Sequence, residues 1–89
     1  MQADDVFRKL LKELRLAKNL TQTELAVRLG QPQSYVSKYE TGERRLDFVE
    51  TAFLCDVLGM SMEEFTTVFT NRLTKVRRVK AEGPKGGTR

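Results

Sequence analysis

Apolar residues recur at helical spacing near the start of the chain. Between Asp4 and Lys18 they fall every three or four positions, while charged residues take the other faces. Asp4 and Asp5 also suit the positive end of a helix dipole. We therefore predict a helix over about residues 4–18, with a core face formed by Phe7, Leu10, Leu11, Leu14 and Ala17.

Three pairs of polar residues mark the starts of later helices. In each pair a Thr, Asp or Ser is followed three residues later by Glu, so that each side chain can accept a hydrogen bond from the other residue's backbone N–H. The pairs are Thr21 with Glu24, Asp47 with Glu50, and Ser61 with Glu64. Three such capping boxes set the register of the helices that follow them.

Glycines mark where these helices end. Gly30, Gly42 and Gly59 each follow a periodic apolar segment, and glycine forms a left-handed C-cap at the least cost. We predict helices at about 22–29, 33–41 and 47–58, and a fifth that begins near Met62. The predicted fold is all-α, a compact five-helix bundle that occupies residues 1–71 as one domain.

The second and third predicted helices form a tight pair. Both are too short to be stable alone, and Gly30, Gln31 and Pro32 force a sharp change of direction between them. Small and apolar residues on both helices can lock them together: Leu25, Ala26, Leu29, Val36 and Tyr39. This pattern predicts a helix-turn-helix.

The residues around this turn carry a family resemblance. The stretches LTQTELAVRLG and QSYVSKYETGERRLD, followed by Leu58 and Gly59, resemble the Cro/cI (Xre) class of bacterial and phage helix-turn-helix repressors over about residues 7–65. The resemblance implies a lambda-repressor-like DNA-binding domain, usually dimeric. It also implies that the third helix lies in the major groove and the second crosses the DNA backbone.

The same resemblance assigns site residues position by position. It implies that bases are read by Gln33, Ser34 and Lys38. It implies backbone or secondary DNA contacts for Gln22, Tyr35, Ser37, Thr41, Arg44 and Arg45. Arg15 and Glu40 occupy family positions that form an ion pair joining the first helix to the third. The chemistry suits these roles, because glutamine can pair with adenine and lysine with guanine.

Plainer interpretations stay open for several of these residues. Gln33 and Ser34 could be ordinary solvated residues at a helix start, and Lys38 could contact a phosphate instead of a base. Arg44 and Arg45 could simply form a basic turn.

Composition narrows the function classes. The 89-residue chain has no histidine and one cysteine, Cys55, so the usual metal sites and catalytic triads lack their main ligand and base. We expect no enzyme activity, no cofactor and no metal, and a buried thiol at Cys55; the alternative for Cys55 is a redox switch or nucleophile. Neither a membrane span nor a signal peptide is visible. We therefore expect a cytoplasmic, nucleoid-associated protein.

The positive charge lies at the end of the chain. Residues 1–71 hold nine Lys/Arg against eleven Asp/Glu, whereas residues 72–89 hold seven against one. Residues 72–80 could be a helix extension or a strand, either of which could serve as a dimerisation arm. Residues 81–89 are predicted to be a disordered basic tail, which could contact nucleic acid or only aid solubility.

Apolar residues off the predicted core face suggest a dimer. Phe53 and Val57, together with Phe69 or Val68, could form an exposed apolar patch, unless the end of the chain covers them. We predict a sequence-specific regulator that binds double-stranded DNA, most simply a homodimeric repressor. An antitoxin or adaptor that binds a protein partner is the alternative, and an enzyme or nucleotide-binding protein is the weaker one.

Overall fold

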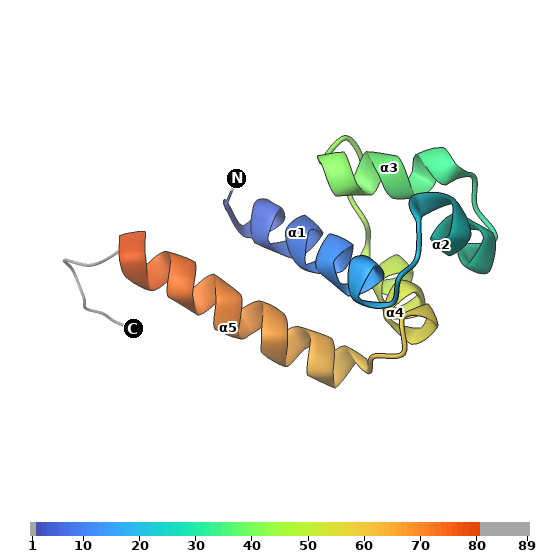
Figure 1. Cartoon of the computed structure of the whole chain (residues 1–89). Coiled ribbons are helices and arrows are strands. Elements are labelled where there is room, and N and C mark those ends of the chain that lie inside the picture. The colour runs from blue at the N-terminus through green and yellow to red at the C-terminus, as the bar shows by residue number, and fades with distance from the viewer. Residues whose placement is uncertain (1, 81–89) are drawn as a thin grey trace.

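Five helices form the part of the chain that the structure, a computed structural model, describes, residues 2–80 (Figure 1). They are α1 (Gln2–Ala17), α2 (Gln22–Leu29), α3 (Gln33–Thr41), α4 (Phe48–Val57) and α5 (Met62–Lys80). Helix α1 packs against both α3 and α5, which lie on opposite sides of it in Figure 1. The predicted all-α, five-helix fold is therefore confirmed.

All three predicted capping boxes are present. The Thr21 hydroxyl accepts a hydrogen bond from the Glu24 N–H at 3.0 Å, and the Glu24 carboxylate accepts one from the Thr21 N–H at 2.8 Å. The same reciprocal pair joins Asp47 to Glu50, and Ser61 to Glu64. Each box satisfies two backbone donors that a helix start would otherwise leave without a partner, so α2, α4 and α5 begin where predicted.

The helices around the predicted turn end at left-handed glycines. Gly30 has a φ of 68° and Gly42 a φ of 90°, a region in which any side chain would be strained. The N–H of Gly30 bonds to the carbonyls of Ala26 and Val27 at the end of α2. Both helix ends therefore depend on the absence of a Cβ atom.

The core lies where α1, α2, α3, α4 and α5 converge. Its buried side chains are Leu10, Leu11, Leu20, Leu25, Ala26, Leu29, Val36, Tyr39, Leu54, Cys55, Leu58 and Phe65. The five residues predicted to lock α2 to α3 are all among them. Phe7 packs edge-on against Phe65 and Phe69, and so joins α1 to α5.

A single stripe of residues forms the buried face of α4. Thr51, Leu54, Cys55 and Leu58 face the core, at the i, i+3, i+4, i+7 spacing of a single stripe. Phe48 falls on the flank of this stripe, and 74% of its surface stays exposed. Phe48 therefore contributes little to the core.

Residues 72–80 are helical. Helix α5 runs without a break through residue 71 to Lys80, so the strand alternative for this segment was wrong. Arg72 forms an ion pair with Glu13 of α1 at 2.7 Å, which holds the two helices side by side. The predicted basic tail, residues 81–89, lies outside the described residues.

Candidate nucleic-acid interface

A buried ion pair joins α1 to α3. Arg15 Nε donates to Glu40 Oε2 at 2.7 Å, and Arg15 Nη2 donates to Glu40 Oε1 at 3.0 Å. Arg15 Nη1 also donates to the Leu20 carbonyl at 2.7 Å. The hydrogen bond to Glu40 raises the pKa of Arg15, against the opposing effect of burial. Both side chains are almost fully buried, so this two-point contact fixes the angle of α3 against α1.

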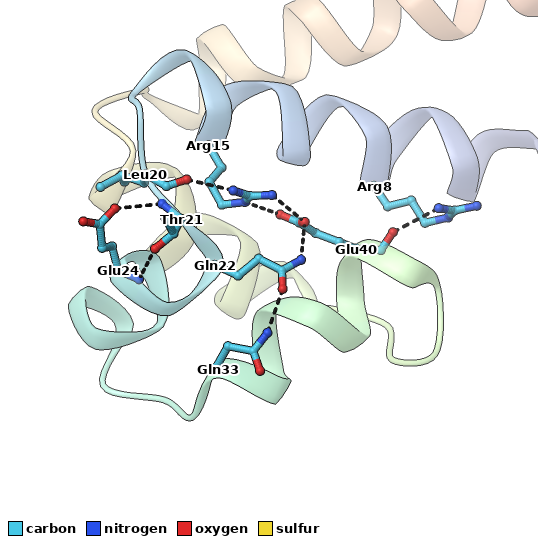
Figure 2. Close-up of polar contacts among 8 residues, drawn as sticks. All are labelled: Arg8, Arg15, Leu20, Thr21, Gln22, Glu24, Gln33 and Glu40. Atoms are coloured by element: carbon cyan, nitrogen blue, oxygen red, sulfur yellow. Dashed lines mark hydrogen bonds and ion pairs between the residues drawn. The ribbon is translucent and has the colours of Figure 1, made fainter.

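Two glutamines extend this ion pair to the start of α3 (Figure 2). Gln22 Nε2 donates to Glu40 Oε1 at 2.9 Å, and Gln33 Nε2 donates to Gln22 Oε1 at 2.7 Å. A carboxylate can only accept hydrogen bonds, so Glu40 dictates which end of the Gln22 amide faces it. The Gln22 oxygen must then face Gln33. We call this chain of Arg15, Glu40, Gln22 and Gln33 the glutamine relay.

The relay determines what Gln33 presents to solvent. One N–H of its amide is used on Gln22, which leaves the second N–H and the carbonyl oxygen on the exposed side chain. These are one donor and one acceptor in a fixed order. Gln33 therefore offers a defined hydrogen-bonding edge and not a freely rotating amide.

A second arginine of α1 holds the far end of α3. Arg8 Nη1 donates to the backbone carbonyl of Glu40 at 3.0 Å (Figure 2). Arg8 Nη2 donates to Asp5 Oδ1 at 2.7 Å. The hydrogen bond from Arg8 also lowers the pKa of Asp5. A cation at a helix C-terminus suits the negative end of its dipole. Glu40 is thus held through its side chain by Arg15 and through its backbone by Arg8.

The predicted reading residues share the outer surface of α3. Gln33, Ser34 and Lys38 are exposed, whereas Tyr35 and Ser37 are half-buried at its edges. The Thr41 hydroxyl donates back to the Lys38 carbonyl at 3.2 Å, close to the end of the helix. The three residues predicted to read bases are therefore accessible on α3, while Val36 and Tyr39 anchor its other face in the core.

The two arginines after α3 differ in their surroundings. Arg44 makes two hydrogen bonds to Glu50, at 3.2 and 2.8 Å, and lies 4.7 Å from the centre of the Tyr35 ring. The hydrogen bonding between them raises the pKa of Arg44 and lowers that of Glu50. Arg45 makes one side-chain contact, to Asp4 at 2.9 Å, and 83% of its side chain is exposed. Arg44 is therefore held by the fold far more firmly than Arg45.

Two contacts of this site were not expected from the sequence. Gln22 was expected to make a backbone or secondary DNA contact, and its amide is also the link between Glu40 and Gln33. Arg8 was placed on an outer face of the first helix. Its spacing of seven residues from Arg15 puts both arginines on the same face, and this spacing could have revealed the contact with Glu40.

Comparisons with known proteins show the family of this chain. The HTH_3 family model, described as Helix-turn-helix, matches residues 11–65. A solved structure of an XRE-family like protein from Pseudomonas syringae pv. tomato str. DC3000 is 39% identical in sequence, with a TM-score of 0.74 over 80% of this chain and 87% of that one. This chain belongs to the XRE family of helix-turn-helix proteins. No curated protein sequence gave a significant match.

Membership of the XRE family settles the broad class of this protein. An XRE-type helix-turn-helix of the Cro/cI kind is a DNA-binding domain and belongs to a non-enzymatic family. The matched residues 11–65 include α2, the turn and α3, together with every member of the glutamine relay. None of the described helices is both long and apolar enough to cross a bilayer.

The thiol of this XRE domain is a core group. Cys55 is 1% exposed, and burial raises the pKa of its thiol to about 11. The thiolate, which is the reactive form, is therefore scarce at neutral pH. We expect Cys55 in the folded protein to react with a thiol reagent such as Ellman's reagent only as fast as the domain unfolds. The same labelling in denaturant should be immediate, and fast labelling without denaturant would contradict the buried position.

Proposed function

We propose that this XRE protein is a homodimeric, sequence-specific repressor that reads a two-fold symmetric operator with α3 in the major groove. The observation that carries the proposal is the glutamine relay, which orients the Gln33 amide on the exposed face of α3. A fixed donor and acceptor pair is of use only against a partner with the matching pattern. Such a protein would act in the cytoplasm, on the nucleoid.

Adenine is the base that fits the relay. The free N–H and the carbonyl oxygen of Gln33 match adenine N7, an acceptor, and N6, a donor, in the major groove. Ser34 can serve several bases, and Lys38, one turn further along, suits guanine O6 and N7. We propose that these three side chains supply the base contacts of each half-site.

Phosphate contacts would flank the base contacts. We propose that Gln22, Tyr35, Ser37, Thr41, Arg44 and Arg45 supply backbone or secondary contacts, as the family pattern implies. The bonds of Arg44 to Glu50 make its contribution mainly one of shaping the loop, while Arg45 can turn toward a phosphate. Contacts of this kind position the protein and carry no base information.

An uncovered apolar face supports the dimer. Helix α4 is apolar on nearly all sides, yet the domain buries only one of its faces. Phe48, Val49 and Phe53 are 74%, 73% and 54% exposed, and we call them the α4 patch. Of the four residues expected in a patch, only Phe53 is exposed, because Val57, Val68 and Phe69 pack partly against the core. A second copy would bury the α4 patch and place two reading helices on one side of the duplex.

A charge within the α4 patch should break the dimer. We expect Val49→Glu to convert the protein to a monomer in multi-angle light scattering, because a carboxylate would lose its hydration in the interface. The matched control is Val27→Glu, since Val27 on α2 is 74% exposed and lies outside the patch. If both variants stay dimeric, the patch is not the interface. A monomeric wild-type protein would instead favour a different protein partner for this surface, as in an antitoxin or adaptor.

The proposed function is tested by selection from random duplex DNA. A repressor of this kind should enrich a two-fold symmetric site whose half-sites lie about one helical turn apart, roughly 34 Å. Fluorescence anisotropy should then show tighter binding to the selected site than to a scrambled one. If no sequence is enriched and no duplex is bound, the proposal fails.

A further inference from the structure

A charged cleft of about 330 Å³ opens between the first turn of α1 and the loop that joins α3 to α4. Two carboxylates of α1, Asp4 and Asp5, line it together with the guanidinium groups of Arg8, Arg44 and Arg45. Asp4 and Arg45 form an ion pair across it, whereas Asp5 and Arg8 pair along α1. The cleft therefore lies beside the end of the reading helix, where the loop arginines would meet a DNA backbone.

The three arginines of this cleft are held to very different degrees. Arg8 is bound to a backbone carbonyl and to Asp5, and Arg44 makes two bonds to Glu50 and lies over the ring of Tyr35. Among the described residues, Arg45 has only the 2.9 Å side-chain contact with Asp4, across a sequence separation of 41 residues. Its side chain is the most exposed of the arginines that form ion pairs in the described structure. Arg45 is thus the one guanidinium of the cleft that can change partner without disturbing the fold.

We propose that Asp4 acts as an internal phosphate mimic, whose carboxylate occupies Arg45 until a backbone phosphate of DNA displaces it. The inference rests on the proposed function and adds a residue outside the helix-turn-helix to it. Carboxylate and phosphate oxygens bind the same fork of guanidinium donors, so the two compete for one group. Asp4 keeps the favourable N-terminal end of α1 after the exchange, and an exposed ion pair is weak enough to break.

The exchange would lower the affinity for every DNA sequence alike. A phosphate contact carries no base information, so the competition by Asp4 acts on random and operator DNA equally. The phosphate contact of Arg45 releases cations from the DNA, but the freed carboxylate of Asp4 attracts a cation in exchange. The net release of ions on binding would therefore be smaller than without Asp4. Removing the Asp4 charge should therefore both tighten binding and steepen its dependence on salt.

The test compares Asp4→Asn with a matched variant of the same helix. Glu13→Gln removes the same charge from an exposed ion pair of α1, with Arg72, outside the cleft. In anisotropy titrations at several salt concentrations, we expect Asp4→Asn to bind a random-sequence duplex about threefold to fivefold tighter than wild type. Its slope of log affinity against log salt should steepen by up to about 0.9, while Glu13→Gln should stay close to wild type.

A double-mutant cycle shows whether Arg45 is the group released. The gain in DNA affinity from Asp4→Asn should vanish in an Arg45→Ala background, because Asp4 then has no guanidinium to withhold from the DNA. A gain that persists there, or an equal gain from Glu13→Gln, overturns the inference and leaves the proposed function intact. Failure of every variant and of the wild type to bind any duplex overturns the proposed function and the inference with it.

Discussion

Replacing Glu40 by alanine is expected to destabilise the protein by roughly 3–5 kcal/mol, the largest effect of any single change at the site. The substitution would leave the guanidinium of Arg15, 6% exposed, in the core without its carboxylate partner. For a domain of this size each kcal/mol lowers the melting temperature by about 4–8 °C. Thermal melts followed by circular dichroism should therefore show a fall of at least about 12 °C.

The matched control for this change is Glu13→Ala. Glu13 pairs with Arg72 at the same 2.7 Å distance, but 56% of the Glu13 side chain and 41% of the Arg72 side chain stay exposed. An exposed pair contributes at most about 1 kcal/mol, so the control should melt close to the wild type. Equal melting temperatures for the two variants would show that burial does not distinguish the two ion pairs.

A double replacement separates the stability of the fold from its reading function. Arg15→Met combined with Glu40→Leu removes both buried charges and keeps the volume, which is often neutral or stabilising. Two groups lose a hydrogen-bond partner: the Leu20 carbonyl, which accepts from Arg15, and Gln22 Nε2, which donates to Glu40. We expect the melting temperature of this variant to lie close to that of the wild type. Its Gln22 amide, however, has no acceptor to orient it. If the glutamine relay orients Gln33, this variant should fold normally and bind the operator more weakly.

The fold was predictable because local signals agreed with one another. The capping residues Thr21, Asp47 and Ser61 each occur with a glutamate three residues later, and each box in the structure lies where the sequence places it. Such signals act within one helical turn, so no knowledge of the tertiary structure is needed to recognise them. Helix α5 was harder to delimit, because β-branched residues such as Val76 suit a strand as well.

The remaining features depend on contacts between distant parts of the chain. Gln22 and Gln33 can each be assigned to a DNA contact from the family pattern, but their hydrogen bond to each other depends on the angle between α2 and α3. Arg45 and Asp4 are separated by 41 residues in the sequence, so no local pattern indicates their contact. The 74% exposure of Phe48 likewise depends on how α4 packs within the domain.

Removing the Gln33 side chain should abolish discrimination at one base pair of each half-site. We expect Gln33→Ala to cost about 1–3 kcal/mol on the selected operator, and to cost nothing on operators already altered at that base pair. Gln22→Ala should show part of the same pattern although Gln22 itself bonds to Glu40 and Gln33. Without Gln22 the Gln33 amide can rotate, so its donor and acceptor no longer keep the order that adenine requires.

Anisotropy titrations of Gln33→Ala and Gln22→Ala against operators substituted at each position would measure this discrimination between bases. Gln31→Ala is the matched control, because Gln31 is an exposed glutamine of the same turn. If Gln33 and Gln22 act as one unit, the double variant should lose little more discrimination at that base pair than Gln33→Ala alone. A Gln22→Ala variant that weakens binding to every operator alike would mean that Gln22 acts only through its proposed backbone contact. Discrimination at that base pair would then be a property of Gln33 alone, with the relay reduced to a support of the fold.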